Sequence, residues 1–157
     1  MPDAVPAITL WQPWASLVAL GAKPYEFRAW AAPERLRGRR IAIHAGARPV
    51  RIAEVRALCI GLHSDDPAKR SFLNAEIALP YLDKLRFNRQ LAPLGVVLCT
   101  AILGFPVRAD KLPELAGFAN DSDRGQHFNF AWPLTDIEPL EPPVEVRGEQ
   151  GFWTFSP

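Results

Sequence analysis

Three charged side chains of different chemistry lie close together in the sequence, at Lys23, Glu26 and Arg28. In an extended strand, residues 26 and 28 point to the same side with their Cα atoms roughly 6.5–7 Å apart, and a lysine in the preceding turn can reach the same place. A carboxylate between two cations can accept a hydrogen bond from an amine, hold a phosphate or carbonyl edge through the cations, or position a water molecule. The spacing predicts a ligand-binding or catalytic site.

The elements that must position these side chains can be predicted from the flanking residues. Pro13 suits the first turn of a helix and Gly21 suits the left-handed residue that ends one, which predicts a helix of roughly two turns. Pro24 prevents that helix from continuing, and residues 25–30 alternate as a strand does. A short helix, a glycine turn and a strand are therefore expected to bring the three charges together.

Three tryptophans flank this stretch, at Trp11, Trp14 and Trp30. Trp30 falls on the same strand face as Glu26 and Arg28, where an indole can stack a nucleic-acid base. Trp11 and Trp14 fit packing at the core or its rim as well as base stacking. All three are candidate ligand contacts.

Basic residues are concentrated in the first part of the chain. Residues 1–60 carry nine basic and four acidic residues, a formal +5, whereas the remainder carries nine basic and thirteen acidic residues, a formal −4. A local positive surface of this kind is what a phosphate backbone requires, although an arginine-rich face that is merely solvated explains the same pattern. The candidate backbone contacts are Arg35, Arg37, Arg39, Arg40 and Arg48.

The other polar candidates are scattered. His44 fits either a cleft or a hydrogen-bonded core position, and Asn129 and Gln150 could read a base edge or bond the backbone. Cys59 and Cys99 lie in apolar runs, which favours buried free thiols over a disulfide. Three histidines and two apolar cysteines form no metal-ligand pattern, and no phosphate-binding glycine loop is present, so neither a metal nor a cofactor is expected.

The 157 residues are enough for one domain with a single hydrophobic core, and too few for two such cores. After the first strand we expect a turn at Gly38, a strand over residues 40–46 and a helix over 49–61. A helical insertion at about 63–92 is expected to be interrupted at Pro80. Apolar strands should then follow at 95–105, 128–140 and 152–155, with turns at the prolines after residue 140 and at Gly148. The expected fold is α+β, a small mixed β-barrel with helices outside.

Targeting signals are absent from the sequence. No apolar run reaches the length of about 18 residues that a membrane helix needs, and the N-terminal residues have no signal-peptide pattern. The sequence therefore predicts a cytoplasmic protein without a membrane partner.

Residues 21–28, GAKPYEFR, resemble the G-x-K-x-x-E-x-R signature of ASCH domains (activating signal cointegrator homology). Further segments resemble the family in the same order: LWQPWASLVALG, RGRRIAIHAG, PLGVVLCTAILG and FAWPLTDIEPLEPPVEVRGEQGFW, which together span nearly the whole chain. The resemblance implies a PUA-like β-barrel and a cleft, between the first helix and the barrel, that Lys23, Glu26 and Arg28 line. It is closest to the bacterial and phage-type single-domain members.

The resemblance also implies a class of activity. Members are generally regarded as binding nucleic acid, usually RNA, and some small bacterial members are amidohydrolases that remove the acetyl group from acetylcytidine. Those hydrolases resemble G-x-K-x-x-T, and this sequence carries Glu26 in place of the threonine. The leading hypothesis is thus a module that binds RNA or single-stranded nucleic acid. The alternative is a small hydrolase of a modified nucleoside, with Lys23 and Glu26 as its catalytic residues.

Overall fold

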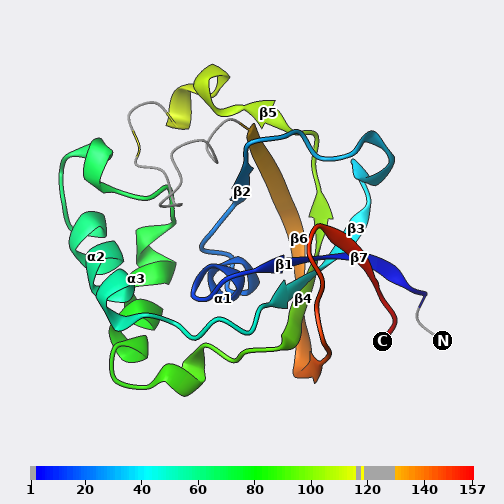
Figure 1. Cartoon of the computed structure of the whole chain (residues 1–157). Coiled ribbons are helices and arrows are strands. Elements are labelled where there is room, and N and C mark those ends of the chain that lie inside the picture. The colour runs from blue at the N-terminus through cyan, green and yellow to red at the C-terminus, as the bar shows by residue number, and fades with distance from the viewer. Residues whose placement is uncertain (1–2, 116–117, 119–129) are drawn as a thin grey trace.

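The computed structural model describes residues 3–115, 118 and 130–157, and its strands form one mixed sheet (Figure 1). Six strands run in the order β2-β6-β4-β3-β1-β7, and β5 pairs with β6 as well. Their bounds are β1 Val5–Leu10, β2 Tyr25–Arg28, β3 Arg40–Ala45, β4 Val96–Leu103, β5 Val107–Arg108, β6 Phe130–Glu145 and β7 Phe152–Phe155. β1 and β3 are parallel, and the remaining pairs are antiparallel. The predicted α+β class with a mixed sheet is confirmed.

The sheet curves as expected of a small barrel-like fold, but its two end strands do not pair. β2 and β7 stand at the two ends of the strand order, and no pairing between them occurs in the described part of the chain. The register shifts between Ile43 and His44 on β3 and at two places on β4. Such bulges bend a sheet without closing it.

β6 is longer than the sequence predicts, because Pro142 and Pro143 do not end it. Up to residue 133 it pairs with β2, whereas from Leu134 onward the register connects it to β4 alone. A strand with one free edge tolerates residues that lack an N–H, since that edge makes no ladder hydrogen bonds. In place of the expected turns β6 has a bulge: Pro139 lies opposite Cys99 and Val144 opposite Val97, so residues 140–143 have no partner in the β4 register.

Both faces of the sheet are buried. On β3, Ile41 and Ile43 join the core that packs under the first helix, while Ala42 joins a second core with Trp153 and Phe155. β1 and β7 pair near the two ends of the chain, with Val5 opposite Phe155, so the termini lie side by side in Figure 1. The alternation expected for residues 41–44 is confirmed.

The described part of the chain has three helices, α1 Trp14–Ala19, α2 Ile52–Leu62 and α3 Ala75–Leu85, of which α1 packs directly on the sheet. α1 lies between layers, because Ala15 and Val18 pack on the sheet core while Leu17 packs on the core shared with α2 and α3 (Figure 1). Short 3-10 turns occupy Glu34–Leu36, Pro67–Lys69, Arg89–Leu91, Ala109–Lys111 and Pro113–Leu115. No helix in the described ranges is long and apolar enough to cross a bilayer.

The predicted interruption at Pro80 is wrong. Pro80 lies inside α3, whose N-terminus is capped by the Asn74 side chain accepting from the Glu76 N–H. Three fully buried residues, Ala78, Leu82 and Leu85, pack this helix into the core, and that burial outweighs the hydrogen bond that proline cannot donate. Residues 67–69 form only a 3-10 turn, and whether the 63–92 segment is an insertion stays a prediction.

Candidate functional site

The turn after α1 fixes where Lys23 begins. Gly21 has a φ of +79°, the left-handed conformation that glycine adopts without strain, and its N–H donates to the Val18 carbonyl. The N–H groups of Ala22 and Lys23 both donate to the Leu17 carbonyl. The local sequence thus ends the helix and aims Lys23 toward the start of β2.

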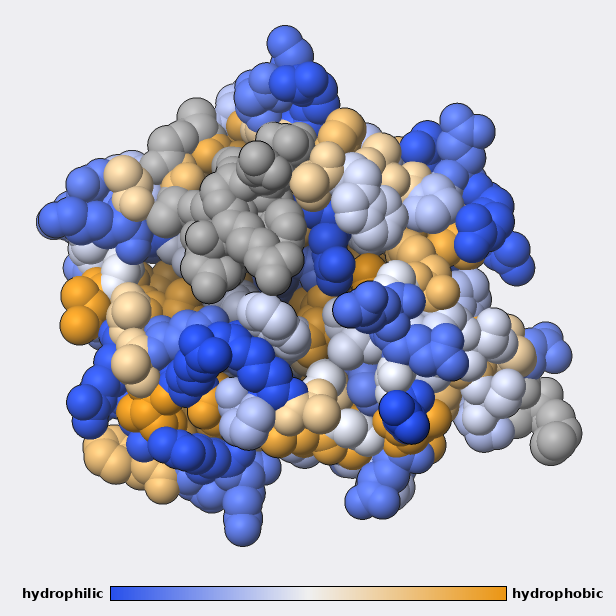
Figure 2. All heavy atoms as spheres, viewed as in Figure 1, coloured by the Kyte–Doolittle hydropathy of each residue, from blue (hydrophilic) through white to orange (hydrophobic). Residues whose placement is uncertain are grey.

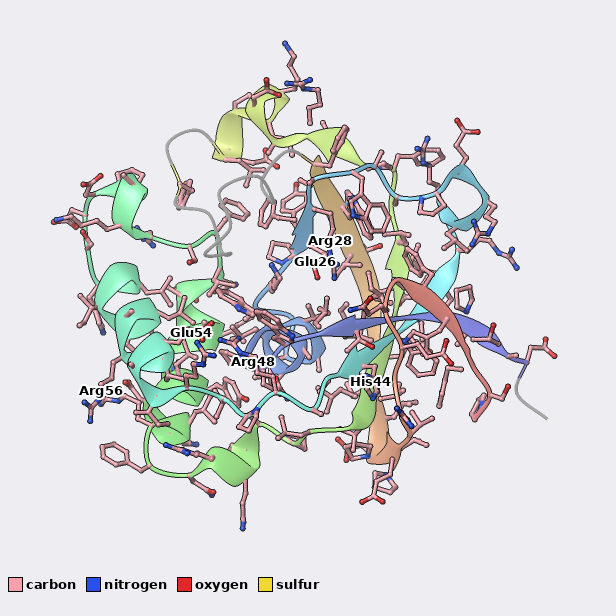
Figure 3. The ribbon with its side chains drawn as sticks, viewed as in Figure 1. Glu26, Arg28, His44, Arg48, Glu54 and Arg56 are labelled. Atoms are coloured by element: carbon pink, nitrogen blue, oxygen red, sulfur yellow. The ribbon has the colours of Figure 1, made fainter. Side chains whose placement is uncertain are left out.

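The structure brings Lys23, Glu26 and Arg28 together as predicted. Glu26 Oε1 lies 3.9 Å from Lys23 Nζ and accepts the Phe27 backbone N–H at 3.0 Å, while Glu26 Oε2 lies 3.5 Å from Arg28 Nη2. Figure 3 shows the Glu26 and Arg28 side chains next to each other beside β2. The carboxylate is therefore held by a backbone donor and flanked by two cations, which is the arrangement that the spacing implied.

Aromatic rings enclose this charged cluster. Lys23 Nζ lies 5.3 Å from the centre of the Trp14 ring and 4.9 Å from that of Phe27, and Arg28 Cζ lies 5.9 Å from the centre of Trp132. A cation over an aromatic face is attracted by the ring quadrupole, most strongly when water is excluded. Trp14 therefore packs against the site lysine from the helix side.

Trp30 extends the site toward solvent. Its ring meets Trp132 edge-to-face at a centroid distance of 4.8 Å, and Trp132 stacks on Phe152 at 5.9 Å. Trp132 is buried, whereas Trp30 keeps 43% of its surface exposed just beyond the end of β2. The strand predicted over residues 25–30 ends at Arg28, so Trp30 lies beyond it and is not on the strand face of Glu26 and Arg28; its ring packs against Trp132 instead.

Exposure increases across the cluster in a definite order. The side chains of Lys23, Glu26 and Arg28 are 1%, 11% and 25% exposed. A ligand arriving from solvent therefore meets Arg28 first, then the Glu26 carboxylate. Lys23 is the innermost of the three, and its Nζ lies next to the Glu26 carboxylate on the buried side.

Two contributors to the site were missing from the sequence interpretation. Trp132 lies opposite Glu26 in the β2–β6 register, and Phe27 packs on Lys23. The alternating stretch FNFAWPL indicated a strand, and this pattern was the available signal that Trp132 faces a neighbouring strand. Its partner could not be inferred, because register between strands far apart in sequence depends on the whole sheet.

Trp11 lies against a different partner. Its indole is 45% exposed, and the Arg48 guanidinium carbon lies 4.1 Å from the ring centre. Arg48 Nη2 in turn lies 3.3 Å from Glu54 Oε2, and Figure 3 shows both side chains between α2 and α1. Trp11 and Arg48 thus form a pair of their own.

The remaining arginines differ in their contacts. Arg40 donates to Thr100 Oγ1 and forms ion pairs with Asp136 and Glu138, and Arg37 donates to the Ala32 carbonyl. Arg35 and Arg39 are exposed. In the space-filling view hydrophilic and hydrophobic residues are interspersed over the face that Figure 2 presents. Arg35 and Arg39 are the most accessible of the predicted backbone contacts.

His44 is a buried, hydrogen-bonded histidine on the other face of β3. Its Nε2 lies 2.8 Å from the Val146 carbonyl oxygen and its Nδ1 lies 3.1 Å from Thr9 Oγ1. Because a ring nitrogen can bond a carbonyl oxygen only as an N–H, Nε2 carries a proton, and the Thr9 hydroxyl lies within hydrogen-bond distance of both His44 Nδ1 and the Glu149 carbonyl. Burial lowers the pKa of His44 below its usual 6.5. The hydrogen bond to the Val146 carbonyl raises the pKa, but this effect is the smaller of the two. His44 is therefore neutral in the folded protein at pH 7.

His44 also borders a pocket of about 720 Å³ that is separate from the Lys23 cluster. Thr9, Gly46, Arg147, Gly148 and Gln150 line it as well, which places the candidate Gln150 at this second location. Asn129 lies outside the residues that the structure describes. Among those residues no group of histidine, cysteine or acidic side chains could hold a metal, and Cys59 and Cys99 are buried free thiols as predicted.

Fold and site together define an α+β domain with an open mixed sheet and a semi-buried cluster of two cations and a carboxylate. No family model matches the chain, and no curated protein matches it in sequence. Among solved structures, the crystal structure of ASCH from Zymomonas mobilis is similar over 90% of this chain and 73% of its own, with 18% identity and a TM-score of 0.49. A point mutant of that protein matches at 19% identity over the same shares, with a TM-score of 0.48.

Proposed function

We propose that this chain is an ASCH-domain protein that binds single-stranded nucleic acid, RNA in the first place, through the cluster of Lys23, Glu26 and Arg28. The observation that carries the proposal is the partial burial of an acid–base cluster next to an exposed indole. Burying three charges costs free energy that a merely structural position could avoid with apolar residues, and such clusters concentrate at functional sites. The motif resemblance supports the same assignment.

The geometry suggests a role for each side chain. Arg28, the most exposed of the three, would hold a phosphate or a carbonyl edge with its planar donors. Glu26 would accept from an exocyclic amine through Oε2, because the backbone N–H of Phe27 is bonded to Oε1 and Oε2 lies on the side of Arg28. Trp30 would stack the base, and Arg35 and Arg39 would follow the phosphate backbone.

Binding of a fluorescently labelled ten-nucleotide RNA, followed by anisotropy at several salt concentrations, tests the proposal. We expect salt-sensitive affinity that falls about tenfold or more in Arg28→Ala and in Glu26→Gln. Arg56→Ala is the matched control, since Arg56 is an exposed arginine on α2, away from the cluster (Figure 3). Equal affinity in all four proteins would exclude this cluster as the binding site.

A hydrolase is the second candidate, and the closeness of Lys23 Nζ to Glu26 Oε1 favours it. In that function Lys23 would polarise the substrate and Glu26 would position a water molecule. Incubation with acetylcytidine and related acylated nucleosides, followed by mass spectrometry, separates the two functions. Turnover by the wild-type protein that disappears in both Lys23→Ala and Glu26→Ala would establish an enzyme. If the folded wild-type protein turns over none of these nucleosides, the binding function remains as the proposal.

A further inference from the structure

Trp11 is exposed yet held in one position. Its neighbour Gln12 is 1% exposed and bonds three groups: its side-chain amide donates to the Pro93 carbonyl and to Ser16 Oγ, and it accepts from the Ser16 N–H. The Trp11 carbonyl accepts from the Ala15 N–H at the start of α1. The backbone that carries this indole is therefore rigid, although 45% of the residue faces solvent.

A paired arginine covers one face of the indole. The Arg48 guanidinium lies 4.1 Å from the ring centre and is held by Glu54, and the two charged side chains are 19% and 30% exposed. A guanidinium stacked on indole is favourable and fixes the ring in advance of binding, which reduces the entropy lost when a ligand stacks on the remaining surface. Trp11 is thus a prepared stacking platform.

This platform adjoins the pocket next to His44. Gly46 lines the pocket, and a Cβ placed on Gly46 would lie 3.8 Å from Trp11 Cδ1 and 3.1 Å from Thr9 Cγ2. The edge of the indole therefore stands beside the glycine that keeps this side of the pocket open. On the β6–β7 connection, Arg147 and Gln150 are exposed and line the same pocket.

The groups around the pocket match the parts of a nucleotide. An indole stacks any base, the Gln150 amide can donate to and accept from a base edge, and the Arg147 guanidinium can hold a phosphate. A pocket of about 720 Å³ lies in the size range typical of small-molecule sites. His44 and Thr9 are hydrogen-bonded to each other, so we assign them a structural role in the wall of the pocket and no chemical reaction.

We propose that this pocket, with Trp11 as its stacking platform, binds a second nucleotide of the same single strand. The inference rests on the proposed function for the class of ligand, but it uses none of the residues of the Lys23 cluster. The strand would then contact the protein at two places, one at Arg28 and one at Trp11. The second contact would add affinity and would require an oligonucleotide rather than a mononucleotide.

The labelled RNA decamer tests this with four variants: Trp11→Ala, Trp11→Phe, Arg28→Ala and, as a control, Phe105→Ala at an exposed aromatic outside the pocket. We expect Trp11→Ala to weaken binding about tenfold or more, Trp11→Phe to stay within about threefold of wild type, and the control to match wild type. A decamer carrying 5-iodouridine should crosslink to the Trp11 peptide under ultraviolet light, which a purely structural role would not produce.

The outcomes separate this inference from the proposed function. Wild-type affinity in Trp11→Ala together with weakened binding in Arg28→Ala would overturn the second contact and keep the first. Weakened binding in Trp11→Ala alone would keep the second contact and overturn the first, and no effect in either would overturn both. If Trp11→Ala does not fold, the inference is tested by the affinity of Trp11→Phe and by the crosslink. A crosslink to a peptide that does not contain Trp11 would overturn the inference.

Discussion

Glu26 of β2 lies directly opposite Trp132 of β6, and the indole N–H of Trp132 donates to the Trp30 carbonyl at 3.1 Å. One buried residue is therefore the ladder partner of the motif glutamate, lies under the Arg28 guanidinium and bonds the exposed tryptophan that follows β2. Because Trp132 also stacks on Phe152, the first residue of β7, the position of Trp30 depends on both β6 and β7. The site is supported by strands far from it in sequence.

Replacement of Trp132 by phenylalanine should loosen this support. The smaller ring leaves unfilled volume and removes the N–H that bonds the Trp30 carbonyl, so we expect the free energy of unfolding to fall by about 1–3 kcal/mol. Urea denaturation measures this, with Phe105→Leu as the control at an exposed ring. A Trp132→Phe protein as stable as wild type would show that the indole does not support Trp30.

Neutralising Arg35 and Arg39 together should weaken RNA binding without affecting the fold. Both are exposed, and each phosphate contact on a single strand contributes roughly 0.7 to the slope of log affinity against log salt. We expect the slope of the double glutamine variant to fall by about 1.4, as measured by anisotropy from low to moderate salt. The matched control changes Arg51 and Arg56, two exposed arginines near α2, and an equal loss there would point to non-specific attraction.

Replacing Arg40, in contrast, should act on stability. Its guanidinium bonds Thr100 and pairs with Asp136 and Glu138 across the sheet, at 27% exposure. Since solvent partly screens these pairs, we expect Arg40→Ala to lower the free energy of unfolding by no more than about 1 kcal/mol. A large loss of RNA affinity at unchanged stability would instead assign Arg40 to the binding surface.

The stability of the protein should fall as the pH drops below about 6.5, in part because of His44. Its pKa is lowered in the folded state, so the unfolded chain binds the proton more tightly, and the stabilisation present above the unfolded value of 6.5 is lost as pH falls through the folded one. We expect His44→Gln to reduce this pH dependence. Urea unfolding at several pH values measures it.

The control for this pH effect is His63→Gln, which changes an exposed loop residue just after α2. It should leave the difference in unfolding free energy between pH 7.5 and pH 5.5 as in wild type. A pH dependence that His44→Gln does not alter would show that other groups determine it.

Gly148 should tolerate no side chain. A Cβ there would lie 2.5 Å from the His44 ring and 2.7 Å from Thr9 Oγ1, both held by hydrogen bonds, so Gly148→Ala must displace the β6–β7 connection. We expect a loss of about 1–3 kcal/mol in the free energy of unfolding, measured by urea denaturation. Glu149→Ala, at the exposed neighbour, should have little effect. Equal stability of the two variants would mean that this connection moves freely.

Much of the site was predictable because it is local. Pro13, Gly21 and Pro24 limit the backbone conformations of their own segment, and strand alternation places Glu26 and Arg28 on one side. These are preferences of single residues and near neighbours, so the sequence determined the turn, the strand and the convergence of the charges. The two buried thiols followed equally from their apolar surroundings.

The remaining features depend on contacts between distant segments. The sequence alone could not show that Trp132 would lie opposite Glu26 or that Arg48 would stack on Trp11. Nor could it show that Pro80 would stay inside α3, because each depends on register and packing across the whole sheet and its helices. Local propensity is worth up to about 1 kcal/mol for most residues and about 3 kcal/mol for proline in a helix. Burial of several side chains exceeds this, so tertiary packing decided these positions.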